Sequence, residues 1–263
     1  MSFLAGRMLI LCYGMPKSGS TLAFELVRGM LRDAGYPQDV FINDHRHADD
    51  LQGTGLGIRN FAKNLSEKKI AEIASEIGPD RKIAVKTHSA MPAGTFGLLE
   101  EMQQKGEIQI VASYRDPREM CLSLLDAARK NTRDGTNAFG GKADLETAAQ
   151  GVERRIRDFR EWASVKGALR LDYDTTAFLP DNAMDKIEPV FGFTCDRAAV
   201  KQYAYKEAYT QKNKARRARY KELSPEQNAE LMDRFGDFIR RVCDLDDQSW
   251  FDECRAEMMS TSC

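Results

Sequence analysis

Short runs of apolar residues alternate along the chain with longer segments in which apolar residues recur at helical spacing. The runs are Met8–Tyr13, Val40–Ile42, Ile83–Val85, Ile108–Ala112 and Ala168–Leu171. Short apolar runs separated by helical segments are typical of parallel strands connected by helices. The pattern predicts an α/β fold, a three-layer sandwich with a central parallel sheet of about five strands.

Two of the helical segments show one clearly apolar face, after the first run and before the third. The residues on these faces are Leu22, Leu26 and Met30 in the first segment and Ile70, Ile73, Ala74 and Ile77 in the second. Such faces are expected to cover the sheet. The length of 263 residues fits a single domain of this kind, which we expect to span 1–263.

Two later helices have clear start signals. Asp116 is a predicted N-cap, with Pro117 at the first helical position and Glu119 at the third, so Arg115 is the last residue before this helix. The segment 224–227, Ser-Pro-Glu-Gln, predicts a second capping box.

Two polar stretches are predicted to be long loops, Asn43–Gly57 and Asn131–Ala143. Long loops in α/β proteins often line the crevice at the strand ends, so both are candidates for an acceptor pocket. Surface insertions without a role are an equally good interpretation.

The segment from Met8 to Leu31 predicts an anion site. An apolar strand leads into the turn Pro-Lys-Ser-Gly-Ser, which opens a helix whose first backbone N–H groups have no partner within it. Lys17 adds a positive charge. The turn lacks the adjacent Lys and hydroxyl residue of the ATPase loop GxxxxGK[ST]. The alternative is a connecting turn that binds nothing.

Composition limits the function classes. Lys and Arg number 39 against 40 Asp and Glu, so the net charge of -1 gives no reason to expect a nucleic-acid partner. The apolar runs are far shorter than the roughly 20 residues that span a bilayer, so we expect no membrane partner. The six cysteines are scattered, without metal-ligand spacing, and with no export signal they predict a cytoplasmic protein with reduced thiols.

Four segments together resemble the sulfotransferases that use 3'-phosphoadenosine 5'-phosphosulfate (PAPS). Residues 16–22, PKSGSTL, resemble the family's PKSGTTW-like loop for the 5'-phosphosulfate. Residues 85–89, VKTHS, resemble its KTHLP-like segment, and residues 114–124, YRDPREMCLSL, its RNPKDVAVS-like 3'-phosphate motif. Residues 169–174, LRLDYD, are a weaker match to its L-x-Y-E-D segment. The resemblance implies a fold similar to that of the P-loop NTPases.

The resemblance also implies which residues bind the donor. Lys17, Ser18, Gly19, Ser20 and Thr21 would wrap the 5'-phosphosulfate, because backbone amides, hydroxyls and a cation suit that group. The remaining implied donor contacts are Arg115 and Ser123 for the 3'-phosphate and Tyr173 for the adenine base.

Catalysis is implied for Lys17 and His88. Lys17 would stabilise the charge left on the 5'-phosphate, and His88 would take the proton of the acceptor. Ser-Ala-Met-Pro follows His88 where the family has Leu-Pro, and some branches use a carboxylate base instead. Without the other motifs, Arg115 would be read as one member of an ion pair with Asp116 or Glu119.

Two further clusters leave alternatives open. The basic residues between Lys212 and Lys221 lie where the family often has a second 3'-phosphate loop, but the family's glycines are absent, so a solvated basic helix is equally consistent. His45 and His47 lie near acidic residues, but their spacing is not diagnostic of a metal site, and we interpret them as loop histidines.

The sequence therefore predicts a PAPS-dependent sulfotransferase. It would transfer a sulfuryl group to a hydroxyl or amine of a small-molecule or glycan acceptor, release adenosine 3',5'-bisphosphate (PAP) and need no metal. The alternatives are an ATP-dependent small-molecule kinase and a non-catalytic protein that binds PAP or PAPS.

Overall fold

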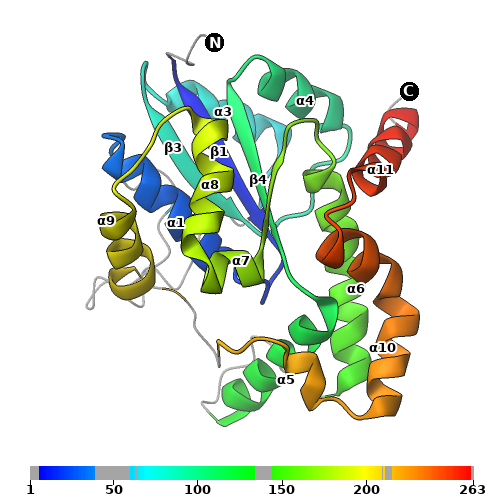
Figure 1. Cartoon of the computed structure of the whole chain (residues 1–263). Coiled ribbons are helices and arrows are strands. Elements are labelled where there is room, and N and C mark those ends of the chain that lie inside the picture. The colour runs from blue at the N-terminus through cyan, green and yellow to red at the C-terminus, as the bar shows by residue number, and fades with distance from the viewer. Residues whose placement is uncertain are drawn as a thin grey trace.

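A five-stranded parallel sheet forms the centre of the molecule, as predicted (Figure 1). The computed structural model describes residues 6–38, 60–62, 64–133, 144–208, 210 and 215–261. The strand order is β2-β3-β1-β4-β5. The strands are β1 Met8–Gly14, β2 Phe61–Ala62, β3 Lys82–Thr87, β4 Ile108–Tyr114 and β5 Leu169–Asp172.

Four of the predicted apolar runs form strands, but Val40–Ile42 lies outside the described residues. The edge strand is instead β2, Phe61–Ala62, which pairs with the end of β3. Only two residues long, β2 has no apolar run of its own that a pattern search could detect.

Helices cover both faces of the sheet (Figure 1). One face is covered by α1 Ser20–Asp33, α8 Pro180–Phe191 and α9 Arg197–Gln202, which continues into η1 Tyr203–Glu207. The other face is covered by α3 Glu67–Glu76, α4 Phe96–Gln104, α5 Pro117–Arg133, α6 Leu145–Ala163, α10 Pro225–Phe238 with η3 Ile239–Asp244, and α11 Gln248–Thr261. Two short helices, α7 Tyr173–Phe178 and η2 Arg219–Glu222, follow β5 and precede α10, respectively.

The central strand shows why its sequence is apolar throughout. Leu9 and Leu11 pack into the core on the α6 side, whereas Ile10 and Cys12 pack against α1 on the other side. Since both faces of the parallel sheet are buried, both sets of alternate positions in this strand carry apolar residues. Every residue of β1 is buried.

The carboxyl ends of the strands meet at one edge of the sheet. The turn after β1, His88 after β3, Arg115 after β4 and Tyr173 after β5 all follow directly from these ends. In Figure 1 this edge faces the labels α5 and α7. The predicted site residues are therefore gathered at the edge of the sheet where α/β proteins bind ligands.

Three local predictions can be compared directly. Asp116 caps α5 by accepting a 2.8 Å hydrogen bond from the backbone N–H of Arg118, and the capping box at the start of α10 forms as expected. The loop expected from Asn131 begins later, because α5 continues to Arg133. Residues 134–143 and the other predicted loop, 43–57, lie outside the described residues.

In the described part of the chain, no helix has the length and apolar character needed to span a membrane.

Candidate functional site

The turn between β1 and α1 presents the start of a buried helix. Gly19 is the N-cap of α1 in the left-handed conformation, with φ of 79°, and it supplies no side-chain cap for the helix. The first turn of α1 contains no acidic residue. Its first amides and the positive end of its dipole are therefore suited to an anion, as predicted from the sequence.

Hydrogen bonds fix the turn in place. The Ser18 hydroxyl donates to the backbone carbonyl of Met15 over 2.7 Å, and the Ser18 backbone N–H donates to the same carbonyl over 3.1 Å. Lys17 has a φ of 72°, in the left-handed region that a non-glycine residue rarely adopts. Such backbone strain is often found at functional sites.

Two glycines allow the strand, the helix and an aromatic ring to approach closely. A Cβ atom on Gly14 would lie 2.2 Å from Ser20 Cβ and 2.4 Å from the Ser113 hydroxyl oxygen. A Cβ atom on Gly19 would lie 2.4 Å from Cδ2 of Tyr173. The ring of Tyr173 therefore rests directly against the turn.

Lys86 reaches the same turn from β3. Its side chain is almost fully buried and its Nζ donates a 2.7 Å hydrogen bond to the Thr21 hydroxyl. Burial lowers the pKa of Lys86 to about 7, although the nearby Glu25 carboxylate acts in the opposite direction. The sequence predicts that Lys86 lies at a strand end near His88. It indicates no role for Lys86, because residue spacing alone does not show that a lysine is buried.

His88 is held by the backbone at the end of β1. Its Nδ1 donates a hydrogen bond to the carbonyl of Gly14, and its ring meets that of Phe61 edge-on with centroids 5.4 Å apart. A carbonyl oxygen only accepts hydrogen bonds, so Nδ1 carries the hydrogen. In the neutral ring the basic nitrogen is then Nε2.

Arg115 lies at the end of β4, between an aromatic ring and a carboxylate. Its guanidinium carbon is 3.9 Å from the centroid of the Tyr173 ring. Its Nε and Nη2 donate to one oxygen of Glu119 over 2.9 and 2.6 Å. The ion pair with Glu119 that the sequence offered as the alternative therefore forms, and Arg115 also contacts Tyr173.

Glu119 is the third residue of α5, as predicted, but its carboxylate does not bond back to the helix start. A glutamate at the third helical position often bonds back to the N-cap backbone. Here its carboxylate instead binds Arg115 and the backbone N–H of Arg219, the latter over 2.7 Å. Sequence reasoning missed this contact because Glu119 and Arg219 are 100 residues apart in the chain.

The segment that precedes α10 lies beside Arg115. The Arg216 backbone carbonyl is 3.5 Å from Nη2 of Arg115, and the Arg217 guanidinium lies 4.7 Å from the centroid of the Phe178 ring. The basic cluster predicted between Lys212 and Lys221 thus reaches the site. Its described part is not an α-helix but an irregular stretch, 215–218, followed by η2. Lys212 and Lys214, like His45 and His47, lie outside the described residues.

The contacts join most of the predicted site residues. Tyr173 links Gly19 to Arg115, and His88 is bonded to the strand that leads into the turn. Ser123 is buried on α5, one helical turn beyond Glu119, and no contact recorded among the described residues links it to the others.

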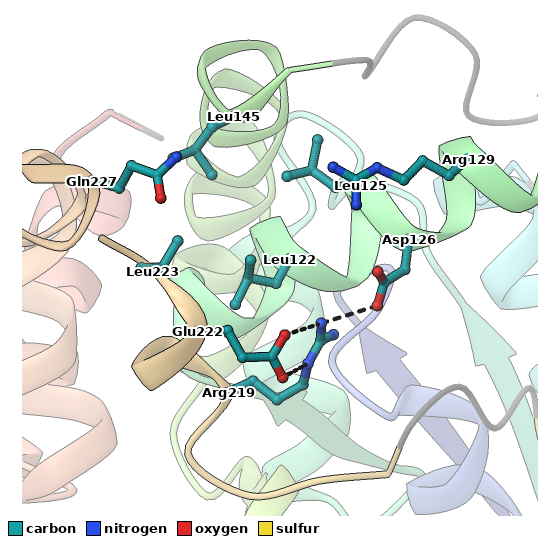
Figure 2. Close-up of a pocket in the computed structure, with 9 residues that line it drawn as sticks. All are labelled: Leu122, Leu125, Asp126, Arg129, Leu145, Arg219, Glu222, Leu223 and Gln227. Carbon is teal, nitrogen blue, oxygen red and sulfur yellow. Dashed lines mark hydrogen bonds and ion pairs between the residues drawn. The ribbon is translucent and has the colours of Figure 1, made fainter. Parts of the chain in front are cut away.

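A pocket of about 250 Å³ lies between α5, the start of α6 and the η2–α10 segment (Figure 2). Leucines 122, 125, 145 and 223 line it together with polar side chains. Arg219 points into this pocket and is held there by Asp126 and Glu222, with Nη2 3.0 Å from an oxygen of each. None of the residues predicted to bind the donor lines this pocket.

The fold and the sheet edge are those of an α/β protein in which the start of the first helix is suited to an anion. Comparison with solved structures then identifies the architecture more closely. The chain is similar to mouse sulfotransferase SULT7A1 complexed with PAP, with a TM-score of 0.55, 15% identity, and coverage of 94% of this chain and 88% of that one. The chain shares its fold with this sulfotransferase structure, and the predicted α/β fold is confirmed.

Two other similar structures are more distant. Retinol dehydratase in complex with androsterone and PAP gives a TM-score of 0.49 and 14% identity, covering 88% of this chain and 79% of that one. The sulfotransferase domain of the Synechococcus PCC 7002 olefin synthase gives 0.43 and 16%, covering 88% of this chain and 94% of that one. Neither the protein-family models nor the curated proteins match the sequence.

Proposed function

We propose that this protein, as one domain over residues 1–263, is a sulfotransferase that takes its sulfuryl group from PAPS. The observation that carries the proposal is the line of contacts from the start of α1 through Tyr173 to Arg115. It joins a helix terminus that suits one phosphate to a guanidinium that suits another. PAPS has two such groups, the 5'-phosphosulfate and the 3'-phosphate.

In the proposed complex, the turn and Arg115 bind different phosphate groups of PAPS. The residues Lys17 to Thr21 hold the 5'-phosphosulfate, and Lys86 adds a buried ammonium through Thr21. Arg115 and Ser123 bind the 3'-phosphate, with Tyr173 against the nucleoside. Arg115 is suited to this role because guanidinium binds a dianion through several N–H donors at once.

In the proposed sulfuryl transfer, Nε2 of His88 is the base. Nε2 removes the proton of the acceptor hydroxyl or amine while that atom attacks sulfur. The new bond to sulfur forms as the bond from sulfur to the bridging oxygen breaks, and the 5'-phosphate leaves as part of PAP. Lys17 stabilises the negative charge that develops on that oxygen. The acceptor is a small molecule or a glycan.

Thermal unfolding tests donor recognition. PAP, PAPS and ATP with magnesium are added separately at equal concentration. A ligand present at 100 times its dissociation constant should stabilise the protein by about 2.7 kcal/mol. We expect PAP and PAPS to raise the melting temperature clearly more than ATP. A larger shift with ATP and magnesium would reject the proposal in favour of a kinase.

Two variants then test the chemistry. Labelled PAPS is mixed with a panel of phenols, alcohols and amines, and sulfated product is measured for wild type, His88→Ala and Lys17→Ala. We expect His88→Ala to bind PAP as wild type does and to lose transfer by about 100-fold or more, the range of general base catalysis. Lys17→Ala should lose both binding and transfer. PAP binding without transfer by wild type would instead support a non-catalytic binding protein.

A further inference from the structure

Glu119 joins the two segments of the chain that surround the proposed 3'-phosphate site. Its side chain is only 5% exposed and its two oxygens have different partners. One oxygen accepts from Nε and Nη2 of Arg115, and the other accepts from the backbone N–H of Arg219 over 2.7 Å. A single carboxylate therefore ties the end of β4 to the stretch that precedes α10.

The contact with Glu119 determines which part of Arg115 faces a ligand. Guanidinium has five N–H groups in a rigid plane. Glu119 accepts hydrogen bonds from the edge of the guanidinium that carries Nε and Nη2, and the ring of Tyr173 packs against one face of its plane. The remaining edge of the plane, at Nη1, has no hydrogen bond recorded in the described part of the chain.

The contact with Arg219 positions a second group of cations. The side chain of Arg219 itself points into the pocket between α5 and η2, where its guanidinium forms ion pairs with Asp126 and Glu222 (Figure 2). Its neighbours Arg216 and Arg217 are exposed, and the Arg216 carbonyl lies beside Arg115. The bond from Glu119 to the Arg219 backbone holds this exposed basic stretch beside Arg115.

From this arrangement we infer that Glu119 is a positioning residue for recognition of the 3'-phosphate. The inference rests on the proposed function. Glu119 orients Arg115 and holds the stretch 215–218 beside it, so that cations from two distant segments face one phosphate. It acts through these groups and does not itself touch the nucleotide.

Repulsion between Glu119 and the phosphate would give the opposite effect. Glu119 is an anion near the position of a bound dianion, so its removal would tighten binding if repulsion dominated. The guanidinium of Arg115 lies between the two and is already paired, whereas loss of Glu119 releases both Arg115 and the Arg219 backbone. The sign of the effect therefore distinguishes a positioning role from repulsion.

The experiment compares two probes, PAP and adenosine 5'-monophosphate, which lacks the 3'-phosphate. Their dissociation constants are measured by titration calorimetry for wild type, Glu119→Ala and Glu119→Gln, and each variant's fold is checked by its thermal transition. We expect Glu119→Ala to reduce the preference for PAP over adenosine 5'-monophosphate by about 10-fold, equivalent to about 1.4 kcal/mol. Glu119→Gln, which keeps its oxygen acceptor and its size, should reduce it less.

Glu222→Gln is the matched control. It removes a carboxylate that pairs with the Arg219 side chain, which keeps its ion pair with Asp126, and it leaves the carboxylate of Glu119 in place. The preference of Glu222→Gln for PAP over adenosine 5'-monophosphate should stay within about twofold of that of wild type.

Each outcome has a distinct meaning. An unchanged or larger preference for PAP in both Glu119 variants would overturn the positioning role. Equal weakening of both probes would also overturn it, because a general loss of structure does not depend on the 3'-phosphate. If wild type itself shows no preference for PAP, the proposed function fails first, and the Glu119 variants are not needed to show it.

Discussion

The two halves of the proposed donor site differ in the groups that form them. The turn before α1 uses main-chain amides, a helix end and residues that are adjacent in the sequence. The region around Arg115 uses side chains from α5 and α7 and backbone groups of the stretch before α10. The first half depends on backbone shape, whereas the second depends on side-chain contacts, some of which join segments that are distant in the sequence.

The two halves should therefore respond differently to substitution. A change in backbone shape at the turn should affect every nucleotide that carries a 5'-phosphate. A change of side chain around Arg115 should affect only nucleotides that carry a 3'-phosphate. Four predictions test this comparison, in order of decreasing effect.

The largest effect is expected from Arg115→Ala. Removal of a paired cation from a phosphate site costs about 2–5 kcal/mol, so PAP should bind about 100-fold more weakly. Adenosine 5'-monophosphate should bind within about twofold of wild type. Titration calorimetry measures both. Arg129→Ala, on the exposed side of the same helix, is the control and should change neither. Equal losses for both nucleotides would remove the distinction between the halves.

Gly19→Ala tests the turn. The added Cβ would lie 2.4 Å from the Tyr173 ring, at a φ of 79° that disfavours alanine. We expect both nucleotides to bind about 10-fold more weakly and the free energy of unfolding to fall by about 1–3 kcal/mol. Gly94→Ala is the matched control, because Gly94 also has a positive φ but has no atom within 4 Å of the added Cβ. A loss for PAP alone would contradict the prediction.

Lys86 makes stability depend on pH. Its pKa is about 7 in the folded protein, whereas an ordinary exposed lysine has a pKa of 10.5. Between these values the unfolded chain holds a proton that the folded chain has released, so unfolding takes up a proton and becomes less favourable as the pH rises. This group should add up to about 1.4 kcal/mol of stability per pH unit between about pH 7 and 10.

Urea denaturation at several pH values measures this slope, with Lys86→Met as the comparison. The variant should lose the contribution of Lys86 and show a shallower rise from pH 7 to 10. A bound anion near Thr21 should raise the pKa of Lys86, so PAP binding at pH 8 should take up protons. Calorimetry in two buffers of different ionisation enthalpy detects that uptake. Identical slopes for wild type and variant would show that Lys86 does not titrate in this range.

Ser123→Ala should give the smallest effect. A neutral hydroxyl contributes about 0.5–1.5 kcal/mol through one hydrogen bond, so PAP should bind about threefold more weakly and adenosine 5'-monophosphate equally well. Titration calorimetry has the precision to resolve that difference. A wild-type affinity for PAP would remove Ser123 from the proposed site.

The difference between the halves also explains how far the sequence could predict the molecule. The sheet, the turn and the caps of α5 and α10 depend on neighbouring residues and on hydrophobic periodicity, which a single sequence displays. The short strand β2 was missed, since two residues form no pattern.

Contacts between distant segments were less predictable. The bond between Glu119 and Arg219 depends on where the stretch 215–222 packs, which no local signal specifies. The burial of Lys86 is similar, because its pKa follows from the packing of α1 on β3. The residue roles predicted from the motifs remain predictions, and the variants above are their test.

The partner of His88 has a consequence for how this protein could change over time. A histidine oriented by an aspartate can be retuned by substituting that aspartate, but here the partner is the main-chain carbonyl of Gly14. A larger residue at Gly14 would collide with Ser20 and Ser113, so the position offers no gradual route of variation. The orientation of His88 is thus inherited with the sheet itself, and under the proposed function adaptation to new acceptors has to come from the surrounding loops.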